Sequence, residues 1–469
     1  MFVPVSVNNG SKSLQWLLLI ATLLTVATSF AQLQGNAGSG YDRSAAYYTF
    51  DFGEGKAPAG YIKVTPVTLY TDSIGYGFSS HFQVHAVDRK TGHLPAGDFI
   101  TAGQPFFFSV KLPEGNYDIK LVLGDANGSS ATTVRVENRR LMLPPVRTTK
   151  GQLVTKSFTV HVRDSLLRNE AGLVTGTVRL KPREVNYPHW DNRLTLEFND
   201  SLPKVCAMEI YSNKTATTVF LAGNSTVVDQ DREPWAAWGQ LFPAFFEPGR
   251  VAIANYAESG ETLLAFRNEK RLDKIWSLAK PGDYLFIEFA HNDQKPGPNH
   301  LEAFTTYTQT LKEWIAEARK RNVTPVLITS MHRRSFDSAG HIVNTLGDYP
   351  EAMLQLARDE KLALIDLHTM SETLYEDWGP AASIRAFVHY PAGSFPGQTT
   401  ALADNTHFSV FGAYELARCV VEGIKRSGLP LGRYLKKDIP AFDPGRPDDH
   451  AAWYWPLSPL LQTIKPDGN

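Results

Sequence analysis

Hydrophobic and polar residues follow two different periods along this chain. Between residues 50 and 211, apolar and polar positions alternate, and Gly, Pro and Asn separate the alternating runs. The alternation is clearest at residues 117–123, 158–162 and 194–198. A period of two is typical of strands with one buried face, and turn residues at short intervals indicate antiparallel neighbours. We therefore predict an antiparallel β-sandwich over residues 33–212.

From residue 217 the pattern changes to short apolar runs separated by longer stretches with helical periodicity. The apolar runs lie at residues 219–222, 251–254, 284–289, 325–329 and 362–365, and the clearest helical stretches at 304–321 and 411–426. Strands that alternate with helices form a parallel sheet covered on both faces. We predict an α/β domain of this kind over residues 216–440. Residues 441–469, rich in Pro and aromatic residues, are expected to form an extended tail on the surface of one domain.

The composition agrees with two globular domains and excludes some partners. The chain has 469 residues, of which 43% are hydrophobic and 11% aromatic, too many for one ordinary core. Lys and Arg total 47 against 48 for Asp and Glu, so no overall field attracts nucleic acid or an anionic membrane. Cys206 and Cys419 are expected to be buried free thiols, and no zinc-binding spacing is present.

Residues 1–31 have the pattern of an export signal. Lys12 precedes the uncharged apolar run 17–26, and Ser29-Phe30-Ala31 resembles a cleavage site. We predict cleavage after Ala31 and an exported protein, periplasmic or extracellular. A membrane anchor is the alternative, although the apolar run is short for a bilayer span.

Two polar segments carry the residue types of a serine hydrolase. Ser225 follows the first predicted strand of the α/β domain, and Asp404 and His407 lie in a loop before the last helix. A serine hydroxyl is a weak nucleophile at neutral pH, so it needs an imidazole to accept its proton and a carboxylate to orient that imidazole. The spacing brings Asp404 and His407 together on one turn, and we expect His407 Nε2 to face Ser225.

Two further polar positions fall at the same edge of the predicted sheet. Gly260 follows the second strand and Asn292 follows the third. In open parallel sheets, ligands bind beyond the carboxyl ends of the strands. Ser225, Gly260 and Asn292 are therefore expected to meet where the chemistry takes place.

These residues resemble the blocks of the SGNH or GDSL-type hydrolases, and among them the rhamnogalacturonan acetylesterases, preceded by a galactose-binding-like β-sandwich. Further resemblance lies at residues 50–53, 235–240 and 347–350. The family implies a flavodoxin-like three-layer α/β/α fold and removal of acetyl groups from the pectin backbone. It also implies that no metal or cofactor is needed.

The resemblance assigns roles to individual residues. Ser225 matches the nucleophile, His407 the base and Asp404 the carboxylate that stabilises the imidazolium. The backbone N–H groups of Ser225 and Gly260 and the side-chain amide of Asn292 match the oxyanion hole.

Two positions depart from the family pattern. Asn224 stands where Asp is common in the first block, and Ala290 stands where glycine is usual in the third. Neither position is a triad residue or an oxyanion donor, so the chemistry should survive. Asn224 is expected to alter the hydrogen bonds around the nucleophile and the titration of His407.

Basic residues in the loops after the third and fourth strands are candidates for substrate binding. Arg333 or Arg334, with Lys295, would bind a galacturonate carboxylate, since guanidinium offers a paired-donor fork. His291, next to Asn292, would line the acyl pocket. The alternative for the adjacent arginines is an ordinary solvated loop.

A cluster of acidic residues follows the nucleophile turn. Asp229, Asp231 and Glu233 are predicted to lie near the start of a helix, where the helix dipole favours negative charge. A cation site is the alternative. Trp235 and Trp238, three residues apart, are expected to be core residues, with sugar stacking as the alternative.

We predict a carbohydrate esterase that deacetylates pectic rhamnogalacturonan by a Ser-His-Asp acyl-enzyme mechanism. The predicted partner is an acetylated pectic polysaccharide or oligosaccharide, with no nucleic acid and no membrane beyond the export signal. One alternative is another ester specificity on the same fold, such as acetyl xylan esterase, lipase or thioesterase. A second is a carbohydrate-binding protein without activity.

Overall fold

The computed structural model describes residues 47–92 and 95–467, which belong to one compact unit. The predicted signal peptide and its membrane-anchor alternative lie outside the described residues. Within the described ranges, no helix has both the length and the apolar character that a membrane span requires. The two cysteines, Cys206 and Cys419, are buried and free, as expected.

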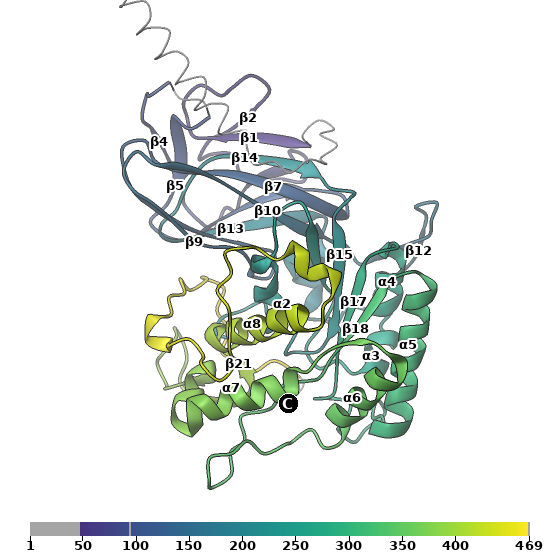
Figure 1. Ribbon diagram of the computed structural model, residues 1–469. Helices are drawn as coiled ribbons and strands as arrows, with labels where there is room; N and C mark the ends of the chain where they lie inside the picture. Colours follow the sequence, from purple (N-terminus) through teal and green to yellow (C-terminus); the bar gives the residue numbers. More distant parts are fainter. Residues whose placement is uncertain (1–46, 93–94, 468–469) are drawn as a thin grey trace, which may run out of the picture. The chain divides into compact units, whose positions relative to one another are not determined.

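The first part of the chain folds as two packed β-sheets (Figure 1). One sheet has the strand order β10-β7-β14-β1-β2, with β5 and β4 attached through β14, and the other has the order β3-β6-β13-β8-β9. Every pairing is antiparallel except that of β1 with β2. The strands are β1 (Tyr48–Phe52), β2 (Ile62–Val64), β3 (Tyr76–Phe78), β4 (His85–Asp88), β5 (Asp98–Thr101), β6 (Phe106–Lys111), β7 (Gly115–Gly124), β8 (Ser130–Val136), β9 (Arg140–Thr148), β10 (Leu153–Val162), β13 (Arg193–Leu202) and β14 (Lys204–Ser212).

The core of this sandwich comes from the alternating positions seen in the sequence. Ile119, Leu121 and Leu123 of β7 are fully buried together with Leu194 and Phe198 of β13. The predicted sandwich architecture is therefore confirmed. A small hairpin, β11 (Leu166–Arg168) with β12 (Val174–Thr177), and two short 3-10 helices, η1 (Glu184–Asn186) and η2 (Pro188–Trp190), lie in the chain between β10 and β13.

The second part is a three-layer α/β/α fold, as predicted (Figure 1). Its parallel sheet has the order β16-β15-β17-β18-β19, the flavodoxin-like order. The strands are β15 (Thr217–Gly223), β16 (Val251–Asn255), β17 (Tyr284–Glu288), β18 (Thr324–Ile328) and β19 (Ala363–Ile365). The helices are α2 (Trp238–Leu241), α3 (Leu263–Asn268), α4 (Arg271–Leu278), α5 (Thr308–Lys320), α6 (Tyr349–Glu360), α7 (Leu367–Ala382) and α8 (Val410–Arg426), with short 3-10 helices η3 (Phe242–Phe245), η5 (Ser383–Ala386) and η6 (Pro430–Tyr434) and the π-helix η4 (Ala303–Tyr307).

Each face of the parallel sheet has its own hydrophobic core. Val219 and Leu221 of β15 pack in one core with residues of α2, α7 and α8. Phe220 and Ala222 point the other way and pack with residues of α3, α4, α5 and α6. Successive side chains of a strand point to opposite faces, so a continuous apolar run serves both cores.

The segment with Asp404 and His407 is a strand and not the predicted loop. It forms β21 (Leu402–Phe408), which pairs with β20 (Phe387–Tyr390) in a separate two-stranded sheet. The register shifts between Phe387 and His389. Residues 404–407 are polar, so the sequence showed no strand pattern there. Backbone pairing in a small sheet outside the main core does not require apolar side chains.

Asp229 and Glu233, in the acidic cluster after the Ser225 turn, pair with arginines and do not start a helix. Helix α2 begins only at Trp238. Arg140 Nη2 lies 2.7 Å from Asp229 Oδ2, and Arg139 Nη2 lies 2.7 Å from Glu233 Oε2; all four side chains are buried. A buried carboxylate is costly unless an opposite charge lies close to it, and the arginines supply that charge here. These pairs join β9 and the turn before it to the α/β fold.

The C-terminal segment contacts both parts of the molecule, whereas we expected it to lie on one. Residues 441–467 contain a single short 3-10 helix, η7 (His450–Ala452). The Arg135 guanidinium of β8 stacks on the Trp455 ring at 3.9 Å. Trp455 Nε1 donates to Glu233 Oε1 at 3.0 Å on the α/β side. Trp455 therefore attaches the C-terminal segment to both the sandwich and the α/β fold.

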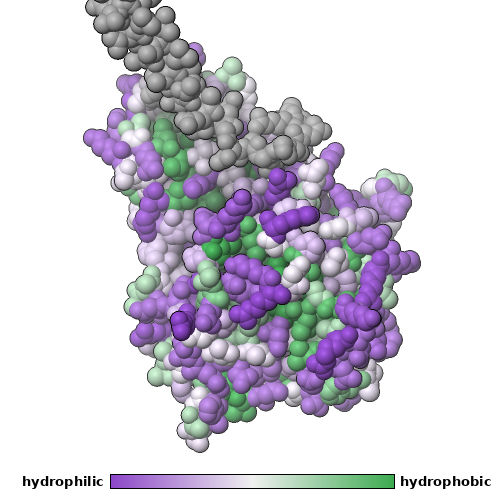
Figure 2. Space-filling view, viewed as in Figure 1, coloured by the Kyte–Doolittle hydropathy of each residue, from purple (hydrophilic) through white to green (hydrophobic). Residues whose placement is uncertain are grey.

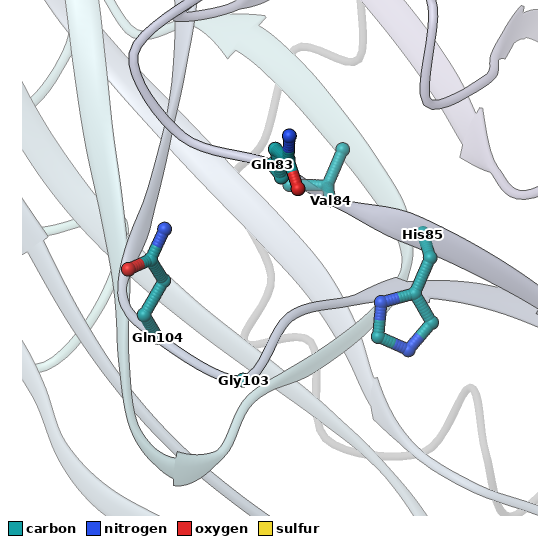
Figure 3. A pocket seen from close by; sticks show the side chains of 5 residues that line it. All are labelled: Gln83, Val84, His85, Gly103 and Gln104. Carbon is teal, nitrogen blue, oxygen red and sulfur yellow. The ribbon is translucent and has the colours of Figure 1, made fainter.

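Two hollows lie on the surface of the sandwich. Hydrophilic residues predominate on the face in Figure 2, with hydrophobic areas between them. A hollow of about 390 Å³ is lined by sandwich residues that include Gln83, His85 and Gln104 (Figure 3). An adjoining hollow of about 290 Å³ shares His85 and includes Arg89. None of the residues lining these two hollows belongs to the α/β fold.

Candidate active site

Ser225 lies in a tight turn directly after β15. A side chain at Gly223 would place its Cβ 2.5 Å from Val227 Cγ2, so this close approach requires glycine. Asn224 Oδ1 accepts hydrogen bonds from Thr226 N at 3.0 Å and Thr226 Oγ1 at 2.9 Å, which fixes the turn. The Ser225 side chain is buried, and its Oγ has no hydrogen-bond partner among the described residues. The hydroxyl is therefore held in place without being engaged.

His407 and Asp404 form a hydrogen-bonded pair on β21. His407 Nδ1 lies 2.9 Å from Asp404 Oδ2, while Asp404 Oδ1 accepts from the backbone N–H of Thr406 at 2.7 Å and of His407 at 3.0 Å. Burial raises the pKa of Asp404, but these hydrogen bonds and the His407 charge outweigh it and lower the pKa. An ionised Asp404 accepts a hydrogen bond from the Nδ1–H group of His407, which leaves the lone pair on Nε2.

One short segment connects the nucleophile turn to β21. Trp238 N donates to Thr226 O at 3.3 Å, and Ala236 N donates to Phe408 O at 3.0 Å. The Trp235 ring meets the His407 imidazole edge to face at 5.8 Å. Thr226, next to Ser225, and Phe408, next to His407, are thus bound by two residues of one segment, Trp238 and Ala236.

The predicted contact between Ser225 and His407 is not a hydrogen bond in this structure. His407 Nε2, like Ser225 Oγ, is buried and has no hydrogen-bond partner within the described ranges. Catalytic hydrogen bonds are often long in a free enzyme and tighten when substrate binds. The structure therefore provides an oriented imidazole and an unengaged hydroxyl on linked segments.

Gly260 and Asn292 are brought together by the loop after β16. Gly260 has φ of +81°, a backbone conformation that favours glycine. Asn292 Nδ2 donates to Glu261 O at 3.0 Å, and Asn292 Oδ1 accepts from Lys295 Nζ at 3.0 Å. These two bonds orient the amide, and the second N–H of Nδ2 remains available for a further acceptor.

Comparison with known proteins identifies both parts of the chain. Residues 48–168 match the Beta-agarase/YXIM esterase-like, galactose-binding domain-like family, and residues 221–408 match the GDSL-like Lipase/Acylhydrolase family. The chain is 42% identical to rhamnogalacturonan acetylesterase RhgT of Bacillus subtilis (strain 168) over 47% of this chain and 95% of that protein. The chain belongs to the GDSL-like lipase/acylhydrolase family. This GDSL-family protein is therefore a carboxylic ester hydrolase.

Two further relatives from Bacillus subtilis (strain 168) match different shares of the chain. The probable rhamnogalacturonan acetylesterase YesY is 34% identical over 48% of this chain and 99% of its own length. The uncharacterized esterase YxiM is 26% identical over 81% of this chain and 91% of its own length. The alignment with YxiM spans far more of this hydrolase, as expected if both the sandwich and the α/β fold are shared.

The two departures from the family pattern lie in buried positions of this GDSL-family hydrolase. Asn224 is fully buried and supplies the acceptor that holds Thr226, a task for which an Asp oxygen would also serve. Its Nδ2 has no hydrogen-bond partner among the described residues. Ala290 packs in the core beneath α3 to α6. Both residues therefore act through packing and turn geometry.

Sequence reasoning missed two basic residues that hold the loop carrying Gly260. Lys181 Nζ donates to Ser259 O at 2.9 Å, and Arg183 Nη2 donates to the same oxygen at 2.8 Å. Arg183 Nη2 also lies 2.8 Å from Glu258 Oε1, and Lys181 pairs with Glu261. The signal was present, because two acidic residues flank Ser259-Gly260 and buried acids need basic partners.

Glu288, at the end of β17, is a second residue that sequence reasoning missed. Its buried carboxylate accepts from Ser330 Oγ at 2.7 Å, Trp238 Nε1 at 3.2 Å and Thr226 Oγ1 at 3.2 Å. Burial outweighs these hydrogen bonds and raises the pKa of Glu288 to about 7. Through Thr226, the Glu288 carboxyl group therefore holds the turn that carries Ser225.

The four candidate substrate-binding residues have different environments. Arg334 donates to Ser383 Oγ at 3.0 Å, to Asn405 Oδ1 at 3.2 Å and to the Pro380 carbonyl, so its guanidinium holds β21 in place. Arg333 donates to His291 O at 3.1 Å and to Thr345. His291 is buried, and burial together with the charges of Arg333 and His407 lowers its pKa. Arg334 is thus held by β21 and its neighbours, Arg333 by Thr345 and the His291 carbonyl, and Lys295 by Asn292.

One group of described residues has metal-ligand chemistry. Glu184, His189 and Glu258 offer ligand atoms within 4.8 Å of one another. Glu184 already pairs with Arg271, and Glu258 with Arg183. A cation there would compete with the guanidinium groups of Arg271 and Arg183, which already pair with these two carboxylates.

Proposed function

We propose that this GDSL-family hydrolase is a carbohydrate esterase that removes O-acetyl groups from pectic rhamnogalacturonan. The supporting observation is the His407–Asp404 pair at 2.9 Å, with Nε2 unengaged and an unengaged Ser225 hydroxyl on a linked segment. The 42% identity to a rhamnogalacturonan acetylesterase supports the substrate class. The basic residues Lys295 and Arg333, next to Asn292 and the His291 carbonyl, favour a polar, acidic substrate over a lipid.

In the proposed reaction, the Ser225 oxygen attacks the carbonyl carbon of the acetyl ester while His407 Nε2 takes the hydroxyl proton. The carbonyl π electrons move to oxygen, and the resulting oxyanion accepts hydrogen bonds from the N–H groups of Ser225 and Gly260 and from Asn292 Nδ2. Asp404 stabilises the imidazolium. The bond from carbon to the sugar oxygen then breaks, and His407 returns the proton to that oxygen.

The second half of the reaction releases acetate. Water attacks the acetyl-Ser225 carbonyl, and His407 takes a proton from the water. The bond between the acyl carbon and Ser225 oxygen breaks, and His407 returns the proton to Ser225. The acid is released with no metal or cofactor in the scheme.

Of the four residues that the sequence suggested for substrate binding, three keep that role in the proposal. Lys295 and Arg333 offer positive charge beside Asn292, and we propose that they bind the galacturonate carboxylate. His291, buried next to the oxyanion donor, lines the acetyl pocket. Arg334 is assigned to the support of β21.

Acetate release from a panel of acetylated rhamnogalacturonan, homogalacturonan and xylan tests the substrate class. We expect the highest kcat/KM on rhamnogalacturonan and a loss of about three to six orders of magnitude in Ser225→Ala and His407→Ala. A fluorophosphonate should label the wild type and not Ser225→Ala. Labelling with equal or better turnover of acetylated xylan would keep the mechanism and overturn the substrate, whereas no labelling would overturn the mechanism.

The cellular location follows as a further part of the proposal. The pattern of residues 1–31 and a polymeric substrate both favour an exported enzyme. Intact-mass analysis of the protein from culture fluid or periplasm should give a chain that begins at Gln32. Recovery of the full-length chain from the cytoplasm alone would overturn this part.

A further inference from the structure

The C-terminal segment is fixed beside the candidate active site. Glu233 N donates to Leu460 O at 2.8 Å, and Gln462 N donates to Glu233 O at 2.9 Å, so the segment pairs with Glu233 as a short parallel bridge. Trp235 Nε1 donates to Gln462 O at 3.0 Å. Trp235 is the residue whose ring meets His407. Residues 460–462 are therefore anchored close to the catalytic base.

Three residues beyond this anchor, Lys465 reaches the triad carboxylate. Lys465 Nζ lies 3.4 Å from Asp404 Oδ2, the oxygen that also contacts His407 Nδ1. Charge-assisted hydrogen bonds are shorter, at about 2.7–2.9 Å. The Lys465 side chain is 49% exposed, whereas that of Asp404 is almost fully buried. The ammonium group thus stands between the buried triad and solvent.

Lys465 belongs to a concentration of positive charge on this side of the site. Burial lowers the pKa of Lys295, and the charges of Arg333 and Lys465 lower it further. Lys295 is also hydrogen-bonded to Asn292, and Arg333 to the His291 carbonyl. The positive charges of Lys295, Arg333 and Lys465 repel one another. An additional anion among these three cations would relieve that repulsion.

We propose that Lys465, supplied by the C-terminal segment, is a specificity-determining residue that binds the carboxylate of a uronate in the substrate. This inference rests on the proposed function and adds a residue from outside the α/β fold to the recognition of the acidic sugar. The Lys465 side chain is half exposed, and its 3.4 Å separation from Asp404 Oδ2 is longer than a charge-assisted hydrogen bond. The ammonium group can therefore donate to a substrate carboxylate while Asp404 keeps its hydrogen bond to His407.

The test separates charge recognition from an effect on the triad. Acetylated rhamnogalacturonan oligosaccharides are compared with the same oligosaccharides after methyl esterification of their carboxylates, and with 4-nitrophenyl acetate. For Lys465→Met, kcat/KM on the acidic form should fall about ten- to a hundredfold, as for loss of one charge-assisted hydrogen bond. It should change less than about twofold on the two uncharged substrates. Lys465→Arg should retain most of the activity on the acidic form.

Two controls make the result specific. Lys320→Met removes one positive charge from a side chain that is 79% exposed on α5, and should leave all three activities unchanged. The KM of the wild type for the acidic form should rise with salt, and that rise should be smaller in Lys465→Met. Thermal melting of each variant confirms that it is folded.

Equal losses on all three substrates would overturn the inference, because Lys465 would then act through Asp404 alone. Unchanged kcat/KM on the acidic form would also overturn it. A wild type that hydrolyses 4-nitrophenyl acetate but no acetylated oligosaccharide would instead overturn the proposed substrate class, and this inference with it.

Discussion

Arg183 Nη2 donates to Glu258 Oε1 over 2.8 Å, and this pair connects the sandwich sequence to the loop that carries Gly260. The same nitrogen donates to Ser259 O, so both residues before Gly260 are held by one guanidinium. Arg183 lies between β12 and β13, inside the sandwich portion of the chain. The sandwich therefore supports the proposed oxyanion hole directly, in addition to any role in binding carbohydrate.

Replacement of Arg183 by methionine should lower turnover more than it weakens binding. Release of Glu258 and Ser259 would let the Gly260 N–H move away from the oxyanion, and oxyanion donors act mainly on kcat. We expect kcat for 4-nitrophenyl acetate to fall about ten- to a hundredfold with less than about a threefold change in KM. Arg179→Met, an exposed residue of the same segment, serves as the control. A change confined to KM would contradict the positioning role.

The buried pair between Arg140 and Asp229 should make the two parts unfold together. Both side chains are almost fully buried, so Arg140→Met leaves an unpaired buried carboxylate and should cost about 3–5 kcal/mol. Denaturant unfolding followed by tryptophan fluorescence and by circular dichroism should give one coincident transition in the wild type. A double-mutant cycle with Asp229→Leu measures the coupling. A coupling near zero, or two separate transitions, would refute this account.

The layers of the fold were predictable because each has a regular period. Alternation at residues 117–123 predicted a strand of the sandwich, and the apolar run at 219–222 predicted a strand buried on both faces. The candidate triad was predictable for a local reason. Asp404 Oδ1 accepts from the N–H of Thr406 and of His407, so the carboxylate folds back over its own segment whether that segment is a loop or a strand.

The supporting residues were not predictable, since their partners lie far away in the sequence. Lys181 and Arg183 bind a loop about 75 residues later, and Lys465 lies beside Asp404 only because its segment pairs with Glu233. Pairs of this kind leave no periodic signal. Asp229 and Glu233 were misread for the same reason, because the arginines that bind them belong to β9 and the turn before it.

Asn292 offers a test of the proposed oxyanion hole with two complementary variants. Asn292→Ala removes both the N–H donor and the acceptor of Lys295, whereas Asn292→Asp keeps an acceptor for Lys295 and removes the N–H. Both should lower kcat by about a hundred- to a thousandfold. Activity near the wild-type level in Asn292→Asp would show that the residue acts only by holding Lys295.

Glu288 should make stability depend on pH in a defined direction. Its pKa is raised to about 7 in the folded protein by burial, whereas a glutamate in the unfolded chain titrates near 4.3. Between these values the folded state holds a proton that the unfolded state has lost, so stability falls as pH rises and levels off above pH 7. Glu288→Gln lacks this titration. The difference in unfolding free energy, wild type minus variant, should therefore decrease by about 3 kcal/mol between pH 4 and pH 8.

Chemical denaturation of both proteins across that pH range measures the difference, and the subtraction cancels the other buried carboxyls that titrate in the same window. Gln has the shape of Glu and keeps one acceptor oxygen for the donors Ser330, Trp238 and Thr226. A constant offset between the two curves would mean that Glu288 titrates alike in the folded and unfolded states. In that case the carboxylate would be ionised beneath the nucleophile turn at neutral pH, and its hydrogen bonds would outweigh its burial.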